Sequence, residues 1–176
     1  CNLEDLGDEQ VLSKYSPESI LLANGVGAIP HQDQRWKLAS RLREKGYVFL
    51  KIIHPSSCIA SDVKLAEGVQ VMAGSVIQPG TRVGKDSIIN TGVLLDHDCT
   101  VSSNCHLAPG VVFSGGVKVG EGTHIGTGTS VIQGISIGAN SIIAAGSVIY
   151  KNVPDDVTFI QKRHLELDRL RKIRSE

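Results

Sequence analysis

A histidine between two carboxylates is the feature of this sequence best suited to chemistry. His97 stands between Asp96 and Asp98 in the segment Leu95-Asp96-His97-Asp98-Cys99. A carboxylate beside a histidine raises the pKa of the imidazole and fixes its tautomer, which suits a general base near neutral pH. An isolated exposed histidine is more often an ordinary surface residue, so the role of His97 depends on the elements that hold it.

Those elements form a six-residue repeat. Every sixth residue from Ile59 to Ile149 is apolar, and the residue three positions after each, from Asp62 to Gly146, is Gly, Asn or Asp. We interpret each repeat as a short strand with its apolar side chain inside, followed by a turn at a residue that reaches left-handed backbone angles cheaply. Three such faces close one coil, so residues 18 apart stack in a prism of about five coils.

The repeat also relates His106 to His124, which are 18 residues apart. Stacking on neighbouring coils would bring their backbones to about 4.8 Å, where two imidazoles could share a metal ion. His97 occupies a different place in its repeat, and zinc carbonic anhydrases with a similar prism carry two histidines five apart, a pair that this sequence lacks. We therefore expect a site without metal, and we count Asn90, on the strand before His97, among its polar groups.

The residues before the repeat differ in composition, and we expect a partial α/β unit over residues 1–56. Two strands and one helix bury little surface, so the unit resembles the remainder of a larger one. Its expected elements are a buried strand at 19–24, a loop at Gly25-Val26-Gly27, a helix at 32–45 ended by Gly46, and a strand at 47–53.

Pro154 is expected to end the repeat, which assigns residues 57–153 to the prism and 154–176 to a C-terminal tail. Within the tail, residues 158–176 alternate aliphatic and charged side chains and predict a basic amphipathic helix. Three roles stay open for it: a cap on the open end of the prism, subunit packing, or contact of Lys162 or Arg163 with a phosphate.

Composition excludes several classes of protein. Lys plus Arg and Asp plus Glu both number 18, which argues against a nucleic-acid binder. No apolar run reaches the roughly 18 residues of a membrane span, and no signal pattern opens the chain. The four cysteines fit no zinc or redox spacing, so we expect free thiols in a reducing cytoplasm, with Cys99 and Cys105 unbonded in the core.

At this point the sequence resembles a known family. The repeats resemble the left-handed parallel β-helix of bacterial hexapeptide-repeat acyltransferases. The sequence also resembles a narrower group, the sugar acetyltransferases of the sialic acid O-acetyltransferase and bacillosamine or perosamine N-acetyltransferase type. The segments that carry this likeness are Ile89-Asn90-Thr91-Gly92, Asp96-His97-Asp98-Cys99 and Cys105-His106-Leu107-Ala108-Pro109-Gly110, with further similarity at Asn24-Gly25-Val26-Gly27 and residues 48–56.

The resemblance implies a mainly β fold in which the β-helix follows a partial Rossmann-like subdomain. It implies a cytoplasmic bacterial homotrimer whose acetyl-CoA lies in a groove between neighbouring prisms. His97 matches the general base of the family, and Asp98 matches the carboxylate that raises its basicity.

The resemblance also assigns the substrate contacts. For acetyl-CoA they are His106, the backbone N–H of Gly115 at the thioester oxygen, and backbone atoms of Thr127 and Ala145 along the pantetheine arm. For the acceptor they are Asn90, near the sugar, and Asn24 and Gly25, in the sugar-nucleotide loop.

Two departures from the family pattern concern the substrate sites. The first strand and glycine-rich loop that hold the sugar nucleotide are absent, so either the chain is truncated or its acceptor site is incomplete. Residues 158–162 replace the usual Gly-(Val/Asn)-Pro-Ala-Lys segment near the CoA tail.

The favoured hypothesis is an acetyl-CoA-dependent transferase, without metal, that acetylates the amine of a nucleotide-linked amino sugar in cell-surface glycan biosynthesis. O-acetylation of a sialic acid would use the same base and stays open. A hypothesis of another class is a trimeric scaffold prism without catalysis.

Overall fold

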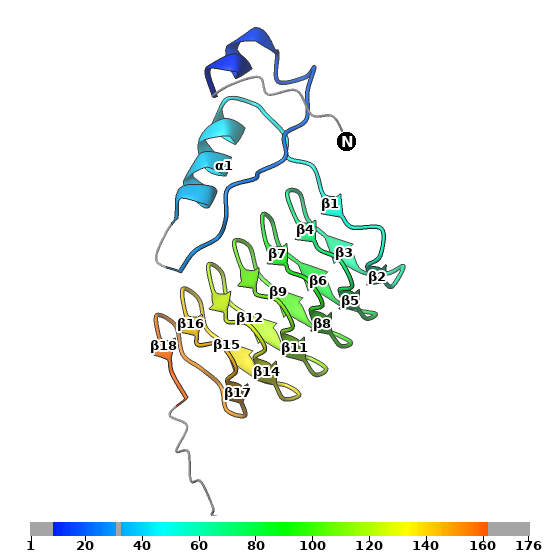
Figure 1. Cartoon of the computed structure of the whole chain (residues 1–176), viewed down its shortest axis with the longest axis vertical. Helices are drawn as coiled ribbons and strands as arrows, with labels where there is room; N and C mark the ends of the chain where they lie inside the picture. Colours follow the sequence, from blue (N-terminus) through cyan, green and yellow to red (C-terminus); the bar gives the residue numbers. More distant parts are fainter. Residues whose placement is uncertain (1–8, 31–32, 162–176) are drawn as a thin grey trace, which may run out of the picture.

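A computed structural model describes residues 9–30 and 33–161. Eighteen two-residue strands, β1 to β18, wind into a parallel β-helix of about six turns with three flat faces (Figure 1). The first face contains β1 (Ile52–Ile53), β4 (Gln70–Val71), β7 (Ile88–Ile89), β10 (His106–Leu107), β13 (His124–Ile125), β16 (Ile142–Ile143) and β18 (Thr158–Phe159).

The other two faces complete each coil. The second face contains β2 (Cys58–Ile59), β5 (Val76–Ile77), β8 (Leu94–Leu95), β11 (Val112–Phe113), β14 (Ser130–Val131) and β17 (Val148–Ile149). The third face contains β3 (Lys64–Leu65), β6 (Arg82–Val83), β9 (Thr100–Val101), β12 (Lys118–Val119) and β15 (Ser136–Ile137). Neighbouring strands pair with residues 18 apart, as in the register of Leu94 with Val112, which confirms the stacking rule.

The turn column, which is every sixth residue from Asp62 to Gly146, explains why the chain can bend so tightly. Every Gly, Asn and Asp of this column except Asp62 has a positive φ angle, including Asp98 at 58°. The small residues that follow are buried in the corners. Their hydroxyls hydrogen-bond to backbone carbonyls of the next coil, as Thr81 Oγ1 does to the Asp96 oxygen at 3.1 Å. Buried polar groups are thereby satisfied without widening the prism.

The β-helix is longer than the five coils expected because it extends at both ends. β1 pairs with β4 although residues 47–53 were expected to form a strand of the α/β unit. At the other end, Val153 bridges to Ile137 and β18 pairs with β16. Pro154 therefore does not end the repeat: the last turn is two residues shorter, and Asp156 takes the left-handed turn position with φ 58°.

The structure corrects the start of the expected C-terminal helix, since Thr158 and Phe159 form a strand. Both are good strand formers, and β16 offers them an unpaired edge. The remainder of the expected helix, residues 162–176 with Lys162 and Arg163, lies outside the described residues.

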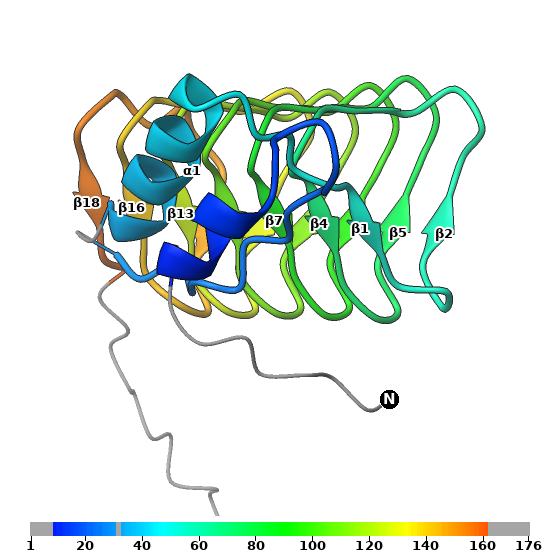
Figure 2. The same cartoon turned by 90° about the horizontal axis from the view of Figure 1, so that it is seen from above.

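The N-terminal segment lies over the first face of the prism (Figure 2). It contains a 3-10 helix, η1 (Glu9–Lys14), and α1 (Gln34–Glu44), which matches the expected helix and is followed by Gly46 with φ 91°. The strand expected at 19–24 is reduced to one parallel bridge between Leu22 and Phe49. A Rossmann-like sheet is thus not confirmed among the described residues. A single bridge offers no further strand with which a sheet could be extended.

A small second core fixes this segment. Its buried members are Ala39, Leu42, Tyr47 and Phe49. It is separate from the core inside the prism, which contains Cys99 and Cys105 as unbonded, fully buried thiols. Their inward place in the repeat was expected from the sequence.

Candidate functional site

The His97 side chain lies at the corner between the second and third faces, just after β8. His97 Nδ1 lies 2.9 Å from Asp98 Oδ2, and the His97 N–H donates to Asp96 Oδ1 at 2.8 Å. The hydrogen bond to Asp98 raises the pKa of His97, with the Asp96 and Asp98 charges acting in the same direction. Because Nδ1 faces the carboxylate, Nε2 is the nitrogen left to accept a proton from a substrate.

The Asp98 carboxylate is held by the coil beneath it. A Cβ built on Gly80 would lie 2.3 Å from Asp98 Oδ1, so the carboxylate occupies the space that any other residue would fill. The Asp98 N–H also donates to the Pro79 carbonyl at 2.9 Å. The turn position therefore serves two purposes at Asp98, since it bends the chain and aims the carboxylate at His97.

Gly115 stacks on His97 from the next coil. A Cβ built on Gly115 would lie 2.5 Å from His97 Nε2 and 2.6 Å from Cε1. The imidazole thus lies against the Gly115 backbone, and no described residue accepts a hydrogen bond from the Gly115 N–H. The structure brings together His97, Asp98 and Gly115 at one corner.

Three further residues predicted for the site lie at a different corner, between the first and second faces. Asn90, Thr127 and Ala145 follow β7, β13 and β16 there, and the Gly146 N–H donates to the Thr127 carbonyl at 2.7 Å. Asn90 Nδ2 lies 3.2 Å from His106 Nε2, so Asn90 contacts His106 rather than His97. Within one chain, the corner bearing His97 is thus separate from the corner bearing Thr127 and Ala145.

His106 and His124 stack as expected from their spacing. They are partners on β10 and β13, with ring centroids 4.7 Å apart and planes at 78°. Burial lowers the pKa of both imidazoles, to about 4 for His124, where the charge of His106 acts in the same direction. Both are therefore neutral at pH 7. Among the described residues, no group of three or more His, Cys, Asp or Glu could hold a metal ion.

The loop predicted to bind the sugar nucleotide is locked to the helix and the prism. The side chain of Asn24 donates to the Arg35 carbonyl and accepts from the Val26 N–H, both at 3.1 Å. Arg35 Nη1 and Gln70 Nε2 both donate to the Asn24 carbonyl, at 2.8 and 2.7 Å. Gly25 lies exposed between these anchored residues. Asn24 thus shapes the loop through its carbonyl and its side-chain amide.

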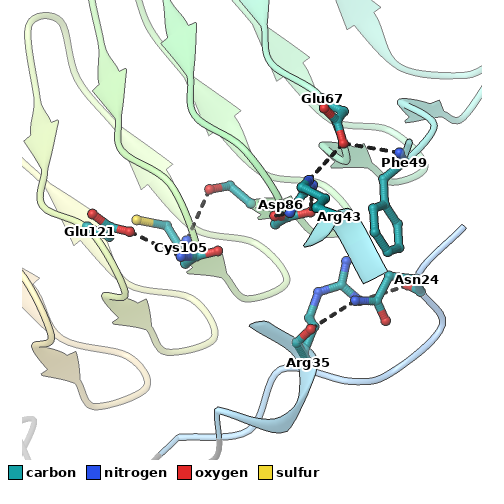
Figure 3. Close-up of polar contacts among 10 residues, drawn as sticks. Asn24, Arg35, Arg43, Phe49, Glu67, Asp86, Cys105 and Glu121 are labelled. Atoms are coloured by element: carbon teal, nitrogen blue, oxygen red, sulfur yellow. Dashed lines mark hydrogen bonds and ion pairs between the residues drawn. The ribbon is translucent and has the colours of Figure 1, made fainter. Parts of the chain in front are cut away.

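A second set of contacts, which the sequence did not predict, clamps α1 to the prism (Figure 3). Arg43 donates two hydrogen bonds to Asp86, at 2.6 and 2.8 Å, and one from Nε to Glu67 at 2.8 Å. Glu67 also accepts from the Phe49 N–H at 3.1 Å. The two carboxylates raise the pKa of Arg43 further, so its charge is fixed. Asp86 is one of three aspartates at the turn positions of the repeat, and nothing in the sequence pairs it with Arg43.

A pocket of about 310 Å³ opens between the N-terminal segment and the first face. One wall comes from the prism and includes His106 and His124. The opposite wall comes from the segment around α1 and includes Trp36. The remaining lining residues are Ala28, Ile29, Pro30, Asp33, Asn104, Gly122, Thr123, Asn140 and Ile142.

The outward side of the second face is an exposed apolar stripe. Leu94 and Val112 are neighbours there, and Val148 lies beyond the exposed Ser130. The three apolar side chains are each more than a third exposed. The matching positions on the third face include Lys64, Arg82 and Lys118, which are exposed and charged. Among the described residues no helix is long and apolar enough to span a membrane.

Comparisons with known proteins agree with this architecture. A family model described as bacterial transferase hexapeptide (six repeats) matches residues 116–151. The structure of PerB from Caulobacter crescentus in complex with CoA and GDP-perosamine is 41% identical with a TM-score of 0.70, over 74% of this chain and 65% of that one. For the acetyltransferase domain of PglB from Neisseria gonorrhoeae in complex with acetyl coenzyme A, the identity is 28% and the TM-score 0.76, over 85% and 73%.

A third similar structure is WeeI from Acinetobacter baumannii, with 27% identity and a TM-score of 0.69 over 73% of this chain and 63% of that one. The chain spans less than two thirds of the Caulobacter perosamine N-acetyltransferase structures, 64% in the mutant complex that also contains CoA and GDP-perosamine. These findings confirm the resemblance to the sugar acetyltransferase group.

Proposed function

We propose that this chain, which matches the hexapeptide transferase model over residues 116–151 and resembles sugar acetyltransferases, moves an acetyl group from acetyl-CoA to the amine of a nucleotide-linked amino sugar. The observation that carries the proposal is the corner at which Asp98 holds His97 against Gly115. The relatives bound to CoA and GDP-perosamine support the two substrate classes.

In the proposed reaction His97 Nε2 accepts the proton of the amine as its nitrogen attacks the thioester carbonyl. Asp98, bonded to Nδ1, stabilises the imidazolium that forms. General-base assistance of this kind contributes about 10²–10⁴-fold. The Gly115 N–H stabilises the negative charge on the carbonyl oxygen. Collapse of the intermediate breaks the carbon–sulfur bond, and the CoA thiolate leaves readily because a thiol is a fair acid.

The division of the predicted residues between two corners supports a homotrimer. In the proposed assembly, the corner bearing His97 on one prism faces the corner bearing Thr127 and Ala145 on the next, and acetyl-CoA lies between them. The exposed stripe of Leu94, Val112 and Val148 supports contact between prisms along the second face. Asn90 and His106 would approach the acceptor and acetyl-CoA from the same groove, and the reaction would serve cell-surface glycan biosynthesis in the bacterial cytoplasm.

The test is thiol release from acetyl-CoA with a panel of UDP-, GDP- and dTDP-linked amino sugars, beside free sialic acid. Cys58 is exposed, so its own reaction with the thiol reagent is subtracted with enzyme lacking acetyl-CoA. Release that depends on one amino-sugar nucleotide and falls at least about 10²-fold in His97→Ala is expected. His54→Ala, an exposed histidine on the first coil, is the matched control and keeps full activity.

Other outcomes assign other functions. Release with sialic acid alone would replace N-acetylation with O-acetylation. No release and no binding of acetyl-CoA in a calorimetric titration would overturn the enzyme proposal in favour of a scaffold.

A further inference from the structure

The backbone N–H of His97 takes no part in the hydrogen bonds between coils. On either side of it in the chain, the Asp96 N–H donates to the Phe113 carbonyl of the next coil, and the Asp98 N–H donates to the Pro79 carbonyl of the previous coil. The His97 N–H, between them, has no backbone acceptor among the described residues. A donor at this place in the repeat is therefore left for a side chain or a ligand.

The same place in the repeat differs from coil to coil along this corner. One coil before His97 it is occupied by Pro79, which has no N–H. One coil after His97 it is occupied by Gly115, whose N–H donates to no described residue. The N–H groups of His97 and Gly115 are thus neighbours, about 4.8 Å apart. A thioester oxygen at this corner could accept a hydrogen bond from either one.

Only the Gly115 N–H lies beside the nitrogen proposed as the base. The His97 imidazole reaches toward the next coil, since a Cβ built on Gly115 would lie 2.5 Å from His97 Nε2. A thioester whose oxygen accepted from the His97 N–H would lie one coil away from this arrangement. Such a register would bind acetyl-CoA without bringing its carbonyl carbon to the base.

Asp96 occupies the donor of this unproductive register. Its Oδ1 accepts the His97 N–H at 2.8 Å. The Asp96 backbone is fixed on two sides, since its N–H donates to the Phe113 carbonyl at 3.0 Å and its own carbonyl accepts from Thr81 Oγ1 at 3.1 Å. The negative charge of the carboxylate also repels the partial negative charge of a carbonyl oxygen.

The corner between the first and second faces has the same arrangement. Asn90 Oδ1 accepts the Thr91 N–H at 2.8 Å, and Pro109, one coil further, has no N–H. The next places along this corner are Thr127 and Ala145, whose N–H groups donate to no described residue. On both corners, two places without a free N–H directly precede the donors proposed to face acetyl-CoA.

We propose that Asp96 is a positioning residue for acetyl-CoA: by occupying the His97 N–H, it leaves Gly115 as the donor for the thioester oxygen and so sets the register of the acetyl group against His97 Nε2. The proposal rests on the proposed function, because it requires a thioester at this corner. Asp96 touches neither the thioester nor the proton that moves, and it acts through the His97 N–H.

Steady-state kinetics with saturating acceptor separate this role from a structural one. Asp96→Ala frees the His97 N–H, so acetyl-CoA binds in both registers. The value of kcat then falls with the productively bound fraction, about twofold for registers of equal affinity and more if the freed donor is preferred. Unproductive binding lowers KM for acetyl-CoA by the same factor, so kcat/KM should stay constant.

Asp96→Asn is the matched variant, because its amide oxygen can still accept the His97 N–H, and it should keep both kcat and KM. Both variants lose a charge that raises the pKa of His97, so rates are compared on the alkaline plateau, where the base is neutral. Gln78→Ala is the control, since Gln78 is exposed at the place of Asp96 one coil earlier and precedes Pro79. A fall of kcat/KM in Asp96→Ala, or an equal loss of kcat in Asp96→Asn, would overturn the proposal.

A second measurement does not depend on turnover. Acetyl-CoA isotopically labelled at the thioester carbonyl is bound to each protein and observed by NMR. Its carbonyl resonance should be the same in the unchanged protein and in Asp96→Asn, and shifted or doubled in Asp96→Ala. This pattern without acetyl transfer keeps the role of Asp96 and refutes the transferase. Identical resonances in all three proteins refute the role of Asp96 even if acetyl transfer proceeds, and a failure of acetyl-CoA to bind refutes both.

Discussion

The His97 imidazole lies so close to Gly115 that a Cβ on Gly115 would come 2.5 Å from His97 Nε2. We therefore predict that Gly115→Ala displaces the imidazole and lowers kcat about 10²-fold, since a misplacement of about 1 Å can cost this much. The φ angle of Gly115 is not in the left-handed region, so the melting temperature should change little. Lys118→Ala, exposed on the third face, is the control. Unchanged kcat in Gly115→Ala would show that His97 is not the base.

The contact between His97 and Asp98 predicts a pH effect. The general base must be neutral, and Asp98 raises the pKa of His97, so kcat/KM should rise with pH through a value above the ordinary histidine pKa. Asp98→Asn removes the charge while tolerating φ 58°, so the acid limb of the profile should move to lower pH and the maximal kcat should fall. A profile that does not move would contradict the role of Asp98.

The clamp between Arg43 and Asp86 predicts a loss of stability in the N-terminal segment. Asp86→Asn keeps the left-handed turn but removes a nearly buried partner charge, which should cost about 3 kcal/mol of unfolding free energy. Because α1 holds the loop at Asn24 through Arg35, KM for the acceptor should rise while KM for acetyl-CoA stays constant. Denaturant titration and two-substrate kinetics measure both, with the exposed Asp62→Asn as control. Equal changes in both KM values would argue against a positioning effect.

The apolar stripe on the second face predicts an interface. A charge in Val112→Glu would be buried between prisms, so light scattering should detect monomers where the unchanged protein is trimeric, and activity should be lost with the assembly. The same change on the third face, Lys118→Glu, should preserve both. A Val112→Glu protein that stays trimeric would place the interface elsewhere.

Regular repetition made the β-helix readable from the sequence. The apolar column, the turn column and the residues between them each repeat without a break from residue 59 to 149. Where the period changes, sequence reasoning failed. Two residues are missing between Ile149 and Val153, and this hid the last turn and made Pro154 look like an end. A pattern fitted with a fixed period cannot follow a coil that loses residues.

At the site, the sequence by itself determined the local contacts. His97 and Asp98 are neighbours in the chain, and Gly115 and His124 follow from the stacking of residues 18 apart, so a fixed period was enough to place them. Only the tertiary structure decided which corner each group occupies, and it separated Asn90 from His97. It also paired Arg43 with Asp86 and closed the pocket beside Trp36. The sequence repeat does not predict how α1 docks, because the docking depends on contacts between residues far apart in the chain.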